Sequence, residues 1–274
     1  MLHSGKTLTL KKYKKTSFEA SITDVKPDPS LPLFPLLHKA DSARQSGKEK
    51  PTALDYFRSG FIEPVPCDVF GENLVYTFIG RPSYRELSRP VCFVIRPAPE
   101  LIQNVFLFDT GAYHENRYRK ILDNELDINL FRIPADQDMI KRFITLNYGD
   151  NAYYYFSLAK DKNLYRLMDS VEEFGYSMLE RIVEFKKVFF DTRCRTLENI
   201  LRTPISLEKY LMAVILPHSL SENQLFLSFC KKAGSSFEIM YYDDSPGSAD
   251  SVSNNRQIDH ILLKYYLEKG YISI

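Results

Sequence analysis

The chain has 274 residues, of which 44% are hydrophobic, so it can bury a proper core in one large domain or two small ones. Its 36 basic and 35 acidic residues leave a formal charge of +1, which excludes a global field that would draw it to nucleic acid or membrane. Any such contact must be local. The N-terminus lacks a secretory pattern, the longest apolar run (211–216) is far too short for a bilayer, and the 4 cysteines are scattered without paired spacing. We therefore expect a soluble, cytoplasmic protein with no membrane contact and no metal.

Residues 1–30 are basic and contain two late prolines, which predicts a basic N-terminal arm ahead of a domain over 31–274. That domain opens with an apolar run over 33–38, predicted to be a strand that ends at His38. Pro51 and Gly60 bracket a predicted short helix over 52–59.

A second strand is predicted at Val75–Ile79, a β-branched and aromatic run that Gly80 and Pro82 must stop. Later strands are predicted at 90–95, 105–108, 153–156, 188–190, 197–201, 211–216 and 237–242. Later helices are predicted at 136–146, across 164–185, at 222–232 and at 258–269, with a polar loop over 243–255. Between two of these elements, the Asp109-Thr110-Gly111 stretch either forms part of a site or, as is more usual, a capped turn. Strands and helices are mixed without regular alternation, so the pattern predicts a single α+β domain.

Several signatures of common enzymes are missing from the sequence. It has no Gly-x-Gly-x-x-Gly, no Gly-Lys-Ser/Thr phosphate loop, no His-Glu-x-x-His and no Gly-x-Ser-x-Gly. Rossmann dehydrogenases, P-loop enzymes, zincins and α/β-hydrolases are therefore poor matches. What remains is an ordered set of three strands that carry His38, Tyr76 and Glu198.

Three short motifs in that order resemble those of the ADP-ribosyltransferases of the His-Tyr-Glu class, which includes diphtheria-like toxins and poly(ADP-ribose) polymerases. The motifs are Leu36-Leu37-His38, then Val75-Tyr76-Thr77-Phe78 followed by Ser83-Tyr84, and finally Arg195-Thr196-Leu197-Glu198-Asn199-Ile200. The first departs from the class because Lys39 and Ala40 follow the histidine in place of small residues. The resemblance implies a split, mainly antiparallel β-core flanked by helices.

The resemblance also implies a reaction on NAD. Breaking the bond between ribose and nicotinamide builds oxocarbenium-like charge on the sugar, and a carboxylate fixed beneath it stabilises that charge. NAD is thus the expected substrate, without a metal. The implied roles are as follows: Glu198 bonds a ribose hydroxyl, His38 orients a ribose, Tyr76 and Tyr84 stack the nicotinamide, Ser83 belongs to the second motif, and Arg81 binds the pyrophosphate.

Alternatives remain open for each of these residues. His38 could be a buried histidine that bonds a backbone carbonyl, and His3, followed by Ser4 and Gly5, competes for the first motif. Tyr76 could simply belong to the core. Glu208 is the next candidate for the role given to Glu198.

The function that the resemblance implies is transfer of one ADP-ribose unit to a macromolecular acceptor, which is RNA, DNA or protein. Small members of the class are often toxins of bacterial toxin-antitoxin or anti-phage defence systems, which implies an antitoxin partner. Two other functions stay open: an NAD glycohydrolase, with water as acceptor, and a non-catalytic binding domain that retains the fold.

Overall fold

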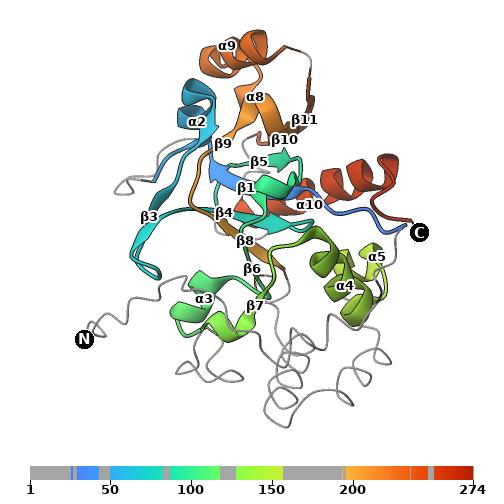
Figure 1. The fold of residues 1–274 in the computed structure, drawn as a ribbon. Helices are drawn as coiled ribbons and strands as arrows, with labels where there is room; N and C mark the ends of the chain where they lie inside the picture. The colour runs from blue at the N-terminus through green and yellow to red at the C-terminus, as the bar shows by residue number, and fades with distance from the viewer. Residues whose placement is uncertain are drawn as a thin grey trace. The chain divides into compact units, whose positions relative to one another are not determined.

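The computed structural model of the protein describes residues 26, 30–42, 50–82, 87–117, 128–156, 193, 196–234, 236–245 and 250–273. It has an α+β fold in which mixed, mostly antiparallel strands are flanked by helices, as the mixed order of elements predicted (Figure 1). Chain contacts divide it into two compact units that interleave in sequence. The first unit comprises 1–33, 66–74 and 102–200, and the second comprises 34–65, 75–101 and 201–274.

The sheet of the second unit has the strand order β11 (Glu238–Tyr242), β10 (Leu211–Pro217), β5 (Pro90–Ile95), β1 (Leu36–Asp41) and β4 (Glu72–Ile79, from Val75 in this unit). β10 and β11 are parallel, whereas the other neighbours are antiparallel. Every residue of β5 is buried, because helices cover both faces of the sheet.

His38 lies in the middle of β1, so the prediction that the strand ends there was wrong. β1 continues to Asp41, which pairs with Pro90 of β5. The polar residue after His38 does not end the strand because Lys39 is buried and its amine donates a hydrogen bond to Asn255 Oδ1. A lysine with a buried partner of this kind cannot be recognised from local sequence.

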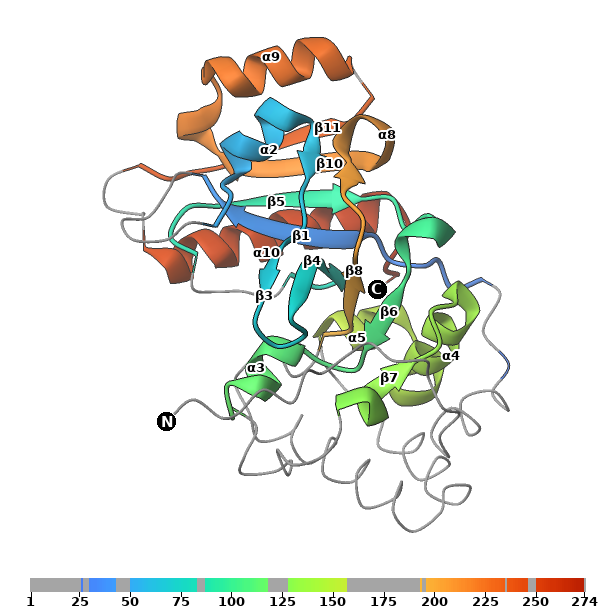
Figure 2. The same cartoon turned by 60° about the vertical axis from the view of Figure 1, so that its left-hand side comes forward.

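α10 (Ser251–Glu268) lies on one face of this sheet, and α2 (Ala53–Ser59) lies on the other (Figure 2). α9 (Gln224–Ala233) packs against α2, with the Phe57 and Phe226 ring centroids 5.1 Å apart. The short helix predicted between Pro51 and Gly60 is confirmed as α2: the Thr52 side chain accepts the Asp55 N–H, and Gly60 is its left-handed C-cap.

The predicted loop over 243–255 was wrong in its last part, because α10 begins at Ser251. Asp250 caps the helix by accepting the Ser253 N–H at 2.7 Å. Its first turns bury Asn254 and Asn255, whose amides bond the chain before β5. Tertiary hydrogen bonds thus stabilise a helix start whose polar composition favours a loop.

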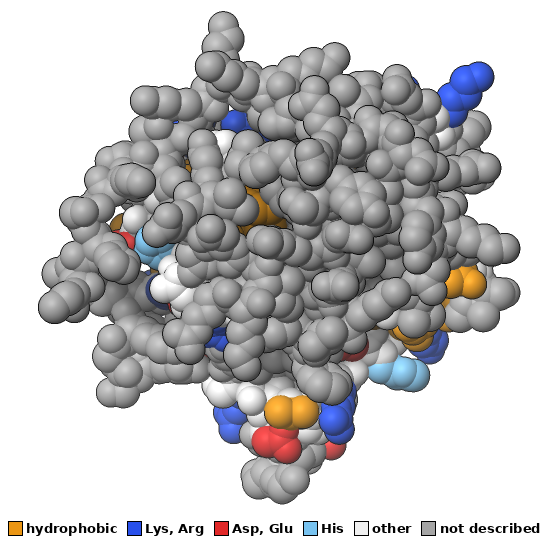
Figure 3. Space-filling view, turned by 90° about the horizontal axis from the view of Figure 1, so that it is seen from below, with side chains coloured by type: hydrophobic (Ala, Val, Ile, Leu, Met, Phe, Trp, Pro, Cys, Tyr) orange, Lys and Arg blue, Asp and Glu red, His pale blue; other side chains and the backbone are white. Residues whose placement is uncertain are grey.

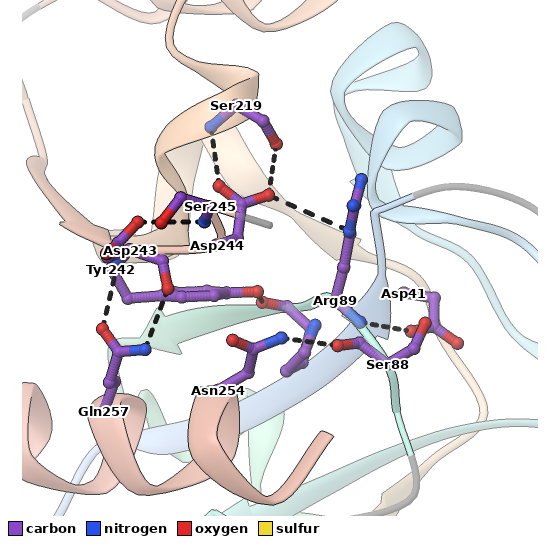
Figure 4. A network of polar contacts seen from close by, with 11 residues as sticks. Asp41, Ser88, Arg89, Ser219, Tyr242, Asp243, Asp244, Ser245, Asn254 and Gln257 are labelled. Atoms are coloured by element: carbon purple, nitrogen blue, oxygen red, sulfur yellow. Dashed lines mark hydrogen bonds and ion pairs between the residues drawn. The ribbon is translucent and has the colours of Figure 1, made fainter. Parts of the chain in front are cut away.

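A polar network joins the start of β5, the end of β11 and the start of α10 (Figure 4). Buried Asp244 accepts hydrogen bonds from the Ser219 N–H at 3.0 Å and hydroxyl at 2.6 Å, and its carboxylate lies 3.9 Å from Arg89 Nε. Asn254 donates to the Ser88 carbonyl at 2.7 Å, and Gln257 exchanges two hydrogen bonds with the Asp243 backbone. The network therefore anchors the chain next to the C-terminal end of β1, where Asp41 pairs with Pro90 of β5.

Short elements complete the second unit. β2 (Phe61–Ile62) pairs with β9 (Ile205–Ser206), and the helical turns are η1 (Pro99–Leu101), α8 (Leu207–Tyr210) and η4 (His218–Leu220). β3 (Val65–Cys67) bridges the boundary between the two units in sequence.

In the first unit, β6 (Asn104–Phe106) pairs antiparallel with β7 (Arg132–Ile133) and with β8 (Glu198–Leu201). Around them are α3 (Thr110–His114), η2 (Ile128–Phe131), α4 (Gln137–Tyr148) and α5 (Asn151–Phe156). The helix predicted over 136–146 is confirmed as α4, with Asp136 as N-cap and Gly149 beyond its end.

The aromatic strand predicted over 153–156 is wrong, because these residues form α5. Asp150 accepts the Tyr153 N–H at 2.8 Å, and the Tyr154 ring lies 5.1 Å from that of Tyr148 on α4. Packing against the preceding helix overrides the strand preference of consecutive aromatic residues. The predictions for 164–185 and 188–190, and for most of 1–30, lie outside the described residues.

Candidate functional site

His38 is held by its neighbouring strand. Its Nδ1 lies 2.8 Å from the backbone carbonyl oxygen of Tyr76 on β4. A carbonyl can only accept, so in the neutral ring Nδ1 carries the hydrogen and Nε2 has the free lone pair. Nε2 is buried and has no hydrogen-bond partner within the part of the chain that the structure describes. The hydrogen bond through Nδ1 therefore fixes the orientation of the imidazole ring, and Nε2 can still accept a hydrogen bond.

Burial lowers the pKa of His38 from 6.5 to about 4, and the bond to the Tyr76 carbonyl offsets only part of this effect. The imidazole is thus neutral at pH 7. Tyr56 of α2 lies edge-on to it with ring centroids 5.4 Å apart, and Phe93 of β5 is 6.3 Å away. The rings pack beside the imidazole, and its buried Nε2 is an acceptor suited to a hydroxyl.

We expect His38→Asn to remove an acid-sensitive part of the stability. The unfolded chain protonates this histidine near pH 6.5 and the folded protein only near pH 4, so the native protein loses stability as pH falls between these values. The shift corresponds to at most about 3 kcal/mol. Asn keeps a donor for the Tyr76 carbonyl but does not titrate.

Urea unfolding of both proteins across this pH range measures the difference. His218→Asn, at an exposed histidine of the same unit, is the control and should follow the natural protein. Parallel curves for His38→Asn and the natural protein would contradict this account of His38.

The structure brings the Tyr76 backbone to His38, but not the Tyr76 side chain. Leu37 pairs with Phe78 across the β1–β4 ladder, and side chains alternate along each strand. Tyr76 therefore shares the face of Leu37 and Phe78, whereas His38 points to the opposite face. The aromatic ring beside His38 is that of Tyr56, which the sequence did not single out.

Arg81 follows the strand terminator Gly80, and its N–H donates to the Ile79 carbonyl at 2.8 Å in a tight turn. The strand thus ends where Gly80 and Pro82 predicted. Ser83 and Tyr84 lie outside the described residues, as does the competing His3.

Glu198 belongs to the first unit and pairs with Phe106 across the β6–β8 ladder. Its side chain is 0% exposed, and its Oε2 accepts the Thr110 N–H at 2.8 Å. Oε1 is buried and has no hydrogen-bond partner among the residues described. Glu208, its rival, is an exposed residue in the first turn of α8.

Burial raises the pKa of Glu198 well above 4.5, and the charge of Asp109 raises it further, while the bonds from Thr110 oppose the shift. The folded protein therefore holds the Glu198 proton to a higher pH than an ordinary glutamate does. Asp109 is the N-cap of α3, as the capped-turn alternative predicted, since its Oδ1 accepts the Ala112 N–H at 2.8 Å. Its second role, beside Glu198, has no signal in the sequence because Asp109 and Glu198 are far apart along the chain.

Among the described residues, no group of three or more His, Cys, Asp or Glu side chains could hold a metal ion. No helix in the described ranges is both long enough and apolar enough to cross a membrane. Comparisons with protein-family models, with curated proteins and with solved structures found no match.

Proposed function

We propose that the protein is an NAD-dependent mono-ADP-ribosyltransferase that modifies a macromolecular acceptor. The observation that carries this proposal is the state of His38: a neutral, half-buried imidazole, fixed through Nδ1, whose buried Nε2 has no hydrogen-bond partner among the described residues. A buried acceptor without a donor is costly. A ribose hydroxyl would supply that donor, which is the role that the resemblance gives to this histidine.

The reaction would proceed by cleavage of the bond between ribose C1′ and the nicotinamide nitrogen. The bonding electrons go to nicotinamide and neutralise its positive ring, while oxocarbenium-like charge builds on the ribose. A lone pair of the acceptor then forms the new bond at C1′, and the acceptor's proton is released to a base. Ionised Glu198 would stabilise the charged sugar, whereas the raised pKa of its buried carboxyl disfavours the ionised form.

Other residues take roles in this proposal through the resemblance alone. Arg81 would bind the pyrophosphate, and Ser83 and Tyr84 would contact the nicotinamide end. Because the Tyr76 side chain faces away from His38, Tyr56 is the better placed aromatic residue for the ring of a ligand bound there.

The biological setting follows from the same resemblance. We propose a cytoplasmic toxin that an antitoxin holds inactive, or a component of anti-phage defence. RNA, DNA and protein all remain candidate acceptors. At the lower edge of the view in Figure 3, basic and acidic side chains lie next to one another, so the described surface there does not favour a nucleic acid.

A second candidate function is a non-catalytic binding domain that retains the fold. The full burial of Glu198 favours it, because a carboxyl with no exposed surface cannot touch a substrate without rearrangement. The binding domain is also favoured because the His38 and Tyr76 side chains lie on opposite faces of the sheet. An NAD glycohydrolase differs from the first proposal only in its acceptor.

The test is incubation of the natural protein with NAD labelled in its adenylate part, together with RNA, DNA and protein mixtures. We expect nicotinamide release and label on one acceptor class. Release with free ADP-ribose as the only labelled product identifies the glycohydrolase. Absence of any release with every acceptor overturns the enzyme proposal and leaves the binding domain.

His38→Asn sharpens the test, because it keeps the donor to the Tyr76 carbonyl and removes the Nε2 acceptor. Its nicotinamide release should fall by about 10-fold or more, the value of roughly 1.4 kcal/mol for one hydrogen bond in the transition state. His218→Asn serves as the control. Full activity of His38→Asn would remove His38 from the site.

A further inference from the structure

The strand β11 forms one edge of the sheet in the second unit (Figure 1). On one side it pairs with β10, in a continuous parallel register from Ala213–Glu238 to Pro217–Tyr242. On its other side, no strand pairs with it in the part of the chain that the structure describes. An open edge of this kind is a template on which another extended chain can form backbone hydrogen bonds.

The residues of β11 do not protect this edge. Natural edge strands are commonly blocked by a proline, a lysine or a bulge. Over Glu238–Tyr242 the strand contains neither residue, and its pairing with β10 has no bulge. Its one charged side chain, Glu238, lies in an ion pair with Lys269 at 2.5 Å. The strand is therefore suited to pairing with a further strand.

Two large apolar side chains on one face of β11 are exposed. Phe237, just before the strand, packs against Phe229 of α9 with ring centroids 5.6 Å apart. Ile239 and Tyr241 follow on the same face, because side chains alternate along a strand, and each is 39% exposed. α9 thus covers the start of this face, and two apolar side chains remain that a partner could cover.

The two ends of β11 differ in charge, and this difference indicates the partner. The N-terminal end has Lys269, bound to Glu238, and the exposed Lys231 and Lys232 in the last turn of α9. The C-terminal end is followed by the exposed Asp243. An antiparallel neighbour with the same ends would bring basic groups to acidic ones at both ends of the pair. A second copy of the chain, related by a two-fold axis, has this arrangement.

We propose that β11 pairs antiparallel with β11 of a second copy, across a two-fold axis near Met240, so that the two sheets become one. In this register Ile239 lies opposite Tyr241 of the second copy, and the reverse pair forms as well. Pairs of aromatic and β-branched side chains stabilise neighbouring strands. The pairing does not depend on any activity toward NAD.

The oligomeric state of the protein tests this pairing. We expect the natural protein to sediment with twice the 31.9 kDa mass of one chain and to dissociate on dilution. Ile239→Lys should raise the dissociation constant by about 10-fold or more, because the dimer contains the substitution twice and loses an apolar cross-strand pair each time. The control is Phe61→Lys, at a 41% exposed strand residue of the separate β2–β9 sheet, which should leave the dimer intact.

Met240→Cys tests the register. Opposite residues of an antiparallel pair have Cα atoms about 4.5 to 5.5 Å apart, which is within the range of a disulfide. Mild oxidation should therefore link two Met240→Cys chains covalently. The natural protein has free cysteines of its own and is the baseline, and Phe61→Cys is the control; neither should form the linked dimer.

A monomer at every concentration would overturn the proposal, whatever other molecule binds the edge. Equal dissociation constants for Ile239→Lys and the natural protein would also overturn it, because the interface then lies elsewhere. Circular dichroism shows whether Ile239→Lys is folded. If it is not, the cross-link decides: a dimeric Met240→Cys protein that forms no disulfide rejects the pairing of β11 with itself.

Discussion

Glu198→Gln is expected to lower NAD cleavage by about 100-fold or more, a loss typical of removing one electrostatic partner from a transition state. The same substitution should stabilise the protein at neutral and mildly alkaline pH by about 1 kcal/mol or more, because it removes a buried acid whose proton the unfolded chain releases and the folded protein retains. Loss of activity together with gain of stability is characteristic of a functional residue in an unfavourable environment.

The pH dependence of that gain follows from the raised pKa of Glu198. Above pH 4.5 the unfolded chain releases the Glu198 proton while the folded protein keeps it, so the natural protein loses stability as pH rises towards the folded pKa. Gln does not titrate. The difference in unfolding free energy between variant and natural protein should therefore be smallest below pH 4.5 and grow as pH rises.

The control for this prediction is Glu208→Gln, at the exposed glutamate that competes with Glu198 in the sequence. Urea unfolding at several pH values and nicotinamide release measure both effects. Glu208→Gln should match the natural protein in both. Loss of activity in Glu208→Gln with full activity in Glu198→Gln would reverse the assignment of the two glutamates.

Gly80→Ala should destabilise the protein by about 3 kcal/mol, the sum of a left-handed backbone strain and an overpacked core. Gly80 has a φ of +69°, which a residue with a Cβ rarely adopts. An added Cβ would lie 2.8 Å from Phe34 Cβ and closer still to the Phe34 ring. That ring cannot yield easily, because it is fully buried and packs against Tyr266 with centroids 5.0 Å apart.

Gly60→Ala separates the two contributions. Gly60 has a similar φ of +80°, but an added Cβ there has nothing within 4 Å. Its expected cost is about 1 kcal/mol from backbone strain alone. Chemical unfolding of both variants tests the account, and equal losses would show that the Phe34 contact contributes nothing.

Helices and strands whose ends are marked by capping or terminating residues were predicted well. α2 begins at the Thr52 cap and ends at Gly60, and α4 has Asp136 and Gly149 at its ends. Such signals act within one turn of helix, so a single stretch of sequence contains them. The end of β4 at Gly80 is a signal of the same kind.

Failures arose where distant partners decide the outcome. β1 runs past His38 because Asn255 of α10 receives the Lys39 amine. The tyrosines of α5 form a helix because Tyr148 packs against them, and α10 starts early because Asn254 bonds the Ser88 carbonyl. Each of these contacts joins residues far apart in the sequence or depends on side-chain packing. The secondary-structure propensity of a short stretch of sequence therefore cannot predict it.

The sequence by itself determined the α+β class and the strands that carry His38, Tyr76 and Glu198, whereas chemistry on NAD follows from a resemblance and stays a proposal. Only the tertiary structure decided what state these residues are in. The strand register turned the Tyr76 side chain away from His38, and the fold placed Asp109 beside Glu198. The physical reason is that facing and pKa depend on neighbours across the sheet and on the exclusion of water, which are properties of the folded chain.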